Sequence, residues 1–183
     1  MVLQLDLSRN QLCGINEYGQ GTYTAEGITA IANALRVNGS LTSLDLSINQ
    51  LCGVTSWGSG TYTADGITAI ADALRVNGSL TVTNLLKNGL DAESKMLAEV
   101  AKQKGISLCG IQRDQTTADF SNKYLKPPDA ILLASDLLQA GVTGSLTSIN
   151  LSENNLTNYG RDMAGITELA AALGVNGSLT KIK

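Results

Sequence analysis

The chain has 183 residues and a formal net charge of −3; 43% of its residues are hydrophobic and only 4% are aromatic. One domain of this length can bury a core, which Leu, Ile, Val and Ala must fill. With no basic block and no apolar run near the ~20 residues of a membrane span, we expect no nucleic-acid and no membrane partner. The sequence has no histidine, the usual general base and the commonest metal ligand. We therefore expect no enzyme activity, no cofactor and no metal site.

A long segment occurs twice near the N-terminus. Residues 12–42 recur as residues 51–81 with 24 of 31 positions identical, which gives a period of 39 residues. The spacing L-x-x-L-x-L-x-x-N-x-L is found at 41–51 and 146–156, at 2–12 with Val2 first, and at 80–90 with Thr83 replacing one leucine. Duplication at a fixed period indicates a repeat protein. Because leucines alternate with polar residues, the pattern predicts parallel strands, near 3–7, 42–46, 81–85, 118–121 and 147–151.

Each of the first two units also contains a helical pattern. Apolar residues recur at i, i+3, i+4 and i+7 and predict one buried helical stripe, formed by Ile28, Ile31, Ala32 and Leu35 and by their equivalents in the second unit. Thr24 is the expected N-cap. Gly27 should let this helix approach a strand closely.

The helices end in Val-Asn-Gly-Ser-Leu, at 37–41, 76–80 and 175–179. We expect Asn-Gly to supply a left-handed residue that turns the chain into the next strand. Cys13 and Cys52 occupy equivalent positions, so a disulfide between them is conceivable. In a chain without a signal peptide, which we expect to be cytoplasmic, small buried free thiols are the favoured interpretation.

The strand, asparagine turn, helix and corner together resemble the leucine-rich repeat of the ribonuclease-inhibitor-like subfamily. This subfamily includes the repeat regions of nucleotide-oligomerisation-domain-like receptors and of Ran GTPase activators. The resemblance implies a right-handed α/β solenoid, or horseshoe, with parallel strands on the concave side and helices on the convex side. It also implies a single domain over 1–183 with about 5–6 repeats, and protein binding as the usual role. The shared residues are structural, so no effector residue is carried over.

The middle of the chain, 91–128, is irregular. Residues 91–104 are expected to form an amphipathic helix closed by Gly105, and Pro127 to start another helix that runs to about Gln139. Between them, 106–111 and 118–121 both resemble strands, but they lie too close in sequence for a helical crossover. One of the two should belong to a half-repeat or a bulging connection, and the register of 105–121 stays open.

The first two units are longer than the subfamily pattern because each has an inserted loop, 13–24 and 52–63. Both loops should leave the same edge, at the carboxyl ends of the strands, where α/β proteins commonly bind ligands. Most aromatic residues lie in such strand-to-helix connections, namely Tyr18, Tyr23, Trp57, Tyr62 and Tyr159. All five are candidate binding residues, although packing as lids over the ends of the leucine core is slightly favoured for Tyr23 and Tyr62. We expect Tyr18 and Trp57 to form one partly exposed aromatic surface for partner recognition.

The outward strand positions are small and polar, and Asp6, Asp45 and Asp119 carry their only charges. This face could bind a basic peptide or simply be a solvated sheet. The leading hypothesis is a non-catalytic protein-binding scaffold that uses the edge loops, this face, or both, with a protein partner of unknown identity. A structural spacer or assembly segment is the alternative, and a carboxylate-based hydrolase using Asp6 and Asp45 is disfavoured. Because both ends lack caps, we expect a piece of a longer protein that could self-associate through them.

Overall fold

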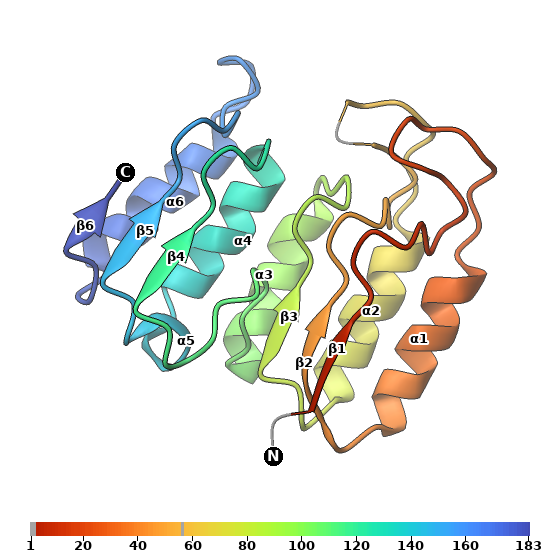
Figure 1. The fold of residues 1–183 in the computed structure, drawn as a ribbon, viewed down its shortest axis with the longest axis horizontal. Coiled ribbons are helices and arrows are strands. Elements are labelled where there is room, and N and C mark those ends of the chain that lie inside the picture. The colour runs from red at the N-terminus through yellow and green to blue at the C-terminus, as the bar shows by residue number, and fades with distance from the viewer. Residues whose placement is uncertain (1–2, 56) are drawn as a thin grey trace.

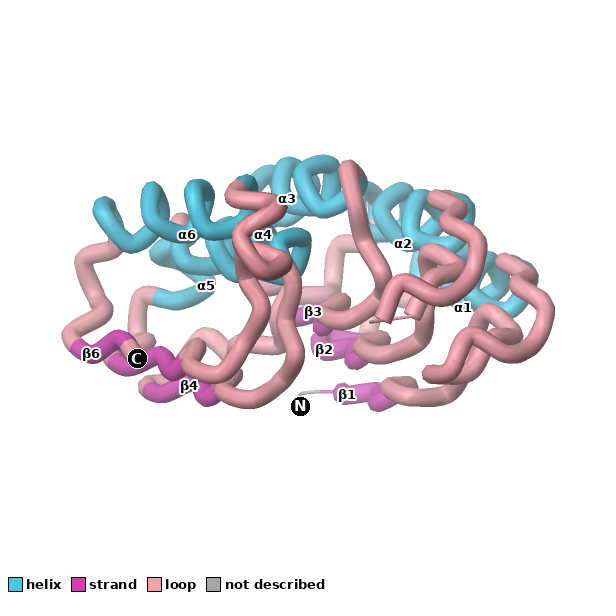
Figure 2. Tube along the Cα trace, turned by 90° about the horizontal axis from the view of Figure 1, so that it is seen from above, coloured by secondary structure: helices cyan, strands magenta, loops and turns pink. Residues whose placement is uncertain are grey.

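A computed structural model describes residues 3–55 and 57–183, so Val2 of the first motif and Ser56 of the second loop lie outside the described residues. Strands and helices alternate along the chain and form two layers, with the helices on one side and the strands on the other (Figures 1 and 2). The elements in chain order are β1 (Leu3–Asp6), α1 (Glu26–Val37), β2 (Leu41–Asp45), α2 (Asp65–Val76), β3 (Val82–Asn84), α3 (Glu93–Lys104), β4 (Thr117–Asp119), α4 (Pro127–Leu137), α5 (Ala140–Thr143), β5 (Ser148–Asn150), α6 (Ala164–Val175) and β6 (Lys181–Ile182).

The strands are parallel, as predicted, but they form two separate sheets, β1-β2-β3 and β4-β5-β6 (Figure 1). Leu5 lies opposite Leu44, which confirms that the first two units stack motif upon motif. One hydrophobic cluster nevertheless extends through both halves, from Cys13 to Ala172. The two sheets therefore share a continuous core beneath the helices.

The helical pattern of the first two units packs as predicted. Ile28, Ala32 and Leu35 of α1 are buried in the core, and the fourth residue of the predicted stripe, Ile31, is partly buried against it. Both helices begin one residue later than a threonine N-cap requires, although the Thr24 hydroxyl still accepts a hydrogen bond from the Glu26 N–H at 3.3 Å. A Cβ built on Gly27 would lie 2.9 Å from the Leu12 carbonyl oxygen, so the close approach of the helix is to the turn after β1 rather than to a strand.

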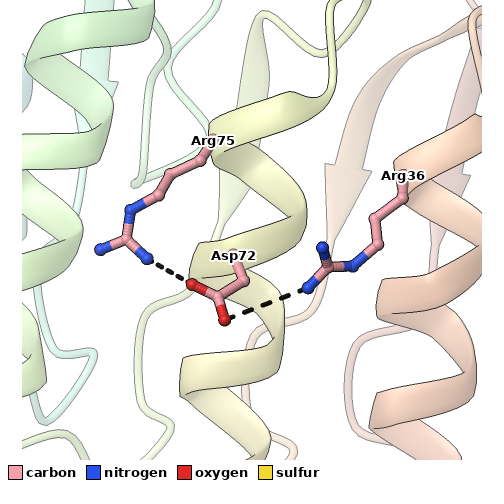
Figure 3. Close-up of polar contacts among 3 residues, drawn as sticks. All are labelled: Arg36, Asp72 and Arg75. Atoms are coloured by element: carbon pink, nitrogen blue, oxygen red, sulfur yellow. Dashed lines mark hydrogen bonds and ion pairs between the residues drawn. The ribbon is translucent and has the colours of Figure 1, made fainter.

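Ion pairs on the outer face of this layer connect α1 to α2. Asp72 pairs with Arg75 of its own helix and lies 4.0 Å from Arg36 of α1 (Figure 3). All three side chains are more than a third exposed. Exposed pairs of this kind stabilise a fold by only about 0–1 kcal/mol, so buried contacts must hold the units together.

The motif asparagines make those contacts. The buried Asn88 amide oxygen accepts from the Asn49 N–H at 2.9 Å, and its nitrogen donates to the carbonyls of Leu46 and Leu85, both at 3.0 Å. Asn49 bonds the first unit in the same way, through the N–H of Asn10 and the Leu7 carbonyl. Each asparagine thus satisfies backbone groups of its own turn and of the preceding turn.

The helix-to-strand corners differ from the prediction of a left-handed Asn-Gly turn. Asn38 is extended, with φ −76° and ψ 120°, and Gly39 is not among the residues with positive φ. The Asn38 side chain instead accepts from the N–H groups of Ser40 and Leu41, at 3.0 and 2.7 Å. Because the side chain closes the turn, the left-handed backbone conformation is not needed.

The sheet divides where 106–111 follows α3, and this resolves the open register. The N–H groups of Thr83 and Leu85 donate to the carbonyls of Ser107 and Leu108, so this segment lies along β3 as a short edge. The N–H groups of Leu108 and Cys109 then donate to the buried carboxylate of Asp136 in α4, at 2.8 and 3.1 Å. Because Asp136 takes these donors, no further strand can pair there, and the second sheet begins anew at β4.

A second buried carboxylate of α4 completes the junction. Asp129 accepts hydrogen bonds from the backbone N–H groups of Lys87, in the turn after β3, and Lys126, before α4, at 2.8 and 2.9 Å. Burial raises the pKa of Asp129, and it raises that of Asp136 to about 6. In the first two units, the motif asparagine of the next unit bonds the turn after the strand. After β3 the Asp129 carboxylate takes this place.

Candidate binding surface at the carboxyl ends of the strands

The two inserted loops are ordered turns that lie side by side. Asn16 Oδ1 accepts from the N–H groups of Tyr18 and Gln20, both at 3.0 Å. At the equivalent position of the second loop, the Thr55 hydroxyl accepts from the N–H groups of Trp57 and Ser59, both at 3.2 Å. A Cβ built on Gly19 would lie 2.9 Å from Ser59 Cβ, so the loops contact each other (Figure 1). Tyr18 and Trp57 are therefore displayed on fixed turns.

A row of left-handed residues runs beneath these loops. Arg9, Ile48 and Lys87 each precede a motif asparagine, and their φ angles are 58°, 58° and 62°. This conformation is costly for a β-branched side chain such as that of Ile48, by about 1–3 kcal/mol. The repeated turn places these three side chains at the same edge of the first sheet, below the aromatic loops.

Three adjoining hollows follow this row, and Ile48 and Lys87 line all of them. We call them together the edge hollow. The first, of about 320 Å³, extends to Arg9 and Tyr18. The second, of about 180 Å³, lies between Trp57 and Tyr124. The third, of about 310 Å³, extends to residues of the second half, among them Asp119, Phe120 and Lys123. The edge hollow thus brings both sheets to one surface.

Tyr124 joins the two halves at this surface. It lies in the connection from β4 to α4, and its ring centroid is 6.0 Å from that of Trp57 with the planes tilted by 54°. The Lys87 ammonium lies 5.7 Å from the Tyr124 ring centroid, within cation–π range. Tyr18, Trp57 and Tyr124 are 71%, 73% and 56% exposed. The ring next to Trp57 is thus that of Tyr124, and Tyr18 lines the adjoining hollow.

The other predicted aromatic residues have different surroundings. The Tyr23 hydroxyl donates to the Leu51 carbonyl at 3.0 Å and accepts from the Gly66 N–H at 3.2 Å. Tyr62 bonds the Glu93 carboxylate at the start of α3. Both tie one unit to the next, but only Tyr23 packs against the core as a lid, whereas Tyr62 is exposed. Tyr159 is 81% exposed in the connection from β5 to α6 and lines none of these hollows.

The predicted aspartates end their strands, but the sheet division separates them. Asp6 and Asp45 are paired in register and line a hollow of about 490 Å³ on the sheet face opposite the helices. Asp119 belongs to the second sheet and lines the edge hollow instead. The pKa of Asp6 and that of Asp119 are both lowered. In each case the largest cause is a hydrogen bond with the side chain of the serine two residues later, and the second is a hydrogen bond with its backbone. The shift at Asp6 thus comes from its contacts with Ser8 in the same turn.

The three cysteines are buried free thiols. Burial is the main cause that raises the pKa of Cys13 to about 11 and of Cys52 to about 12, whereas a reactive thiol needs a depressed value. Within 3–55 and 57–183, no cluster of three or more His, Cys, Asp or Glu side chains could hold a metal ion. Helices long and apolar enough to cross a membrane are likewise absent from this part of the chain.

Sequence reasoning missed Ile48, Lys87, Lys123 and Tyr124. The unit alignment did carry a signal, because Arg9, Ile48 and Lys87 recur at the 39-residue period just before the motif asparagine. The period alone does not show that these three residues lie in a left-handed turn that exposes their side chains. Tyr124 follows the irregular segment, so no periodicity could place it beside Trp57.

Comparison with known proteins adds little to this description. No protein-family model matches the chain, and no curated protein matches it. Among solved structures, the tropomodulin C-terminal domain of Caenorhabditis elegans is similar over 99% of this chain and 72% of that chain, with 14% identity and a TM-score of 0.39. A TM-score of this size supports no conclusion about function.

Proposed function

We propose that this chain is a recognition module of the leucine-rich repeat type, which binds a protein partner without catalysing a reaction. In this proposal the strands line the concave side of a right-handed solenoid, and the edge hollow is the contact surface. The observation that carries the proposal is the group of exposed aromatic side chains, Tyr18, Trp57 and Tyr124. Hydrogen bonds fix the backbone at Tyr18 and Trp57 and on both sides of Tyr124.

Physical arguments support this role. Tyr and Trp offer large contact areas and lose little conformational entropy on binding, and they are enriched at the centres of interfaces. Fixed loops avoid the cost of ordering a flexible segment during binding. The strained backbone at Ile48 fits the same view, because such strain is concentrated at functional positions.

The test compares two exposed aromatic residues. Immobilised wild-type chain, Trp57→Ala and Tyr159→Ala would be used to capture proteins from an extract, and the free energy of unfolding of each variant would be measured in parallel. We expect wild type and Tyr159→Ala to retain the same partners equally. Trp57→Ala should lose more than ~1 kcal/mol of binding free energy for these partners, while its free energy of unfolding stays unchanged. Equal retention of a partner by all three chains would contradict the proposed surface, and no retention by the wild-type chain would favour a spacer.

A further inference from the structure

The edge hollow gathers positive charge in a chain that is negative overall. Three cations, Arg9, Lys87 and Lys123, and two carboxylates, Glu17 and Asp119, line it, so its lining carries a net charge of +1, whereas the formal net charge of the chain is −3. Among the described residues, ion pairs are confined to Arg36, Asp72 and Arg75 in the helix layer (Figure 3). The three cations of the edge hollow therefore lie further than 4.0 Å from any described carboxylate oxygen.

The charges around Lys87 do not balance. Burial is the largest cause that lowers its pKa, and the positive charge of Arg9 is the next. Asp129, Lys123 and Glu17 follow in decreasing order of strength, so the two cations outweigh the two carboxylates at this ammonium group. The Asp129 carboxylate, moreover, is already bonded by two backbone N–H groups. A half-buried ammonium group in a net positive surrounding favours an incoming anion.

The walls of the edge hollow add apolar and amide groups to this charge. Ile48, Trp57 and Tyr124 offer apolar area beside Lys87, and Gln50 offers an amide. This combination matches a short peptide that carries carboxylates next to an apolar side chain. A polyphosphate chain fits less well, because it has no apolar side chain to contact Ile48, Trp57 and Tyr124.

We propose that the edge hollow binds an acidic peptide segment of a partner protein, with Arg9, Lys87 and Lys123 receiving its carboxylates and the Trp57–Tyr124 pair receiving an adjacent apolar side chain. This proposal rests on the binding function proposed above and names the chemistry of the partner. It differs from the basic peptide that the strand aspartates suggested.

The experiment begins with a random peptide library displayed on phage and selected on the wild-type chain. We expect the selected sequences to be enriched in Asp and Glu beside apolar residues. A synthetic peptide of the consensus sequence and its isostere, with Asn and Gln replacing Asp and Glu, would then be titrated by fluorescence anisotropy. The variants are Lys87→Gln, which keeps the backbone bond to Asp129, and Lys104→Gln as a control of equal charge change on the exposed surface of α3.

Each outcome decides the proposal. Losing one partner of a charge pair should weaken binding by about fivefold or more. We expect Lys87→Gln to bind the acidic peptide more weakly by this factor but to bind the isostere as wild type does. Lys104→Gln should bind both peptides as wild type does. Three results would overturn the proposal. They are a neutral or basic consensus sequence, an equal loss of affinity for both peptides in Lys87→Gln, and binding that depends on Lys87 for polyuridylate but for no peptide. Neutral peptides that still require Trp57 would leave the proposed function standing. A library without any enriched sequence would overturn the acidic-peptide proposal, and the capture test would judge the binding function separately.

Discussion

Replacing Asn88 by alanine tests whether the buried asparagines hold the units together. Asn88 and three of its partners, Asn49, Leu46 and Leu85, are each fully buried. Alanine would leave the Asn49 N–H and the Leu85 carbonyl without partners, at original distances of 2.9 and 3.0 Å, whereas the Leu46 carbonyl would lose one of two bonds and keep the one from Asn49 Nδ2. Each of the two unsatisfied groups costs about 1–3 kcal/mol and the lost bond to Leu46 about 1 kcal/mol, and water entering the vacated space lowers the total, so we expect a loss of about 3–5 kcal/mol.

Asn10→Ala is the matched control, because Asn10 has the same motif position in the first unit. Its side chain is exposed, and among the described residues it bonds only the Ser8 carbonyl, at 3.1 Å. We expect a cost below about 0.5 kcal/mol. Asn49→Ala should fall between the two, at about 2 kcal/mol, because its partners Asn10 and Leu7 are open to water.

Guanidinium unfolding followed by far-ultraviolet circular dichroism would measure the three losses. Hydrogen exchange adds a local measurement, because the Asn49 amide should lose protection in Asn88→Ala more than amides of the second sheet do. If Asn88→Ala cost no more than Asn10→Ala, the claim that these side chains join the units would be refuted.

Three further outcomes follow from individual contacts. Gly66→Ala should destabilise the chain by about 1–3 kcal/mol, because the new Cβ would lie 2.7 Å from a carbonyl oxygen. Gly78→Ala is its control, because a Cβ there would have no atom within 4 Å, and it should be neutral or stabilising in the same unfolding assay. The pKa of Asp136 is raised to about 6 from 3.8. The stability that the protonated carboxyl group contributes is therefore fully present below pH 3.8 and is lost as the pH rises through about 6. The stability advantage of wild type over Asp136→Asn should therefore shrink between pH 4 and 7, by at most about 3 kcal/mol, and a constant difference would contradict the raised pKa. The three buried thiols should react with a thiol reagent only on unfolding, and rapid labelling of the native chain would show that they are accessible.

Periodicity in the sequence was sufficient for the repeated parts of the fold. The alternation around Leu44 placed β2 beside β1 in the correct register, and the stripe from Ile28 to Leu35 identified the buried face of α1. Both features depend on local spacing, which the backbone geometry of strands and helices translates directly into faces. The buried thiols followed in the same way from their place within the unit.

Only the tertiary structure decided where the periodic pattern stops. The carboxylate of Asp136 reaches Leu108 and Cys109 from a helix that follows them in the chain, and by bonding their N–H groups it ends the first sheet. Tyr124 meets Trp57 because that break brings the second half of the chain to the edge of the first. Hydrogen bonds and ring contacts between residues far apart in sequence leave no period to detect, so the ends of the sheets and the composition of the edge hollow depend on packing.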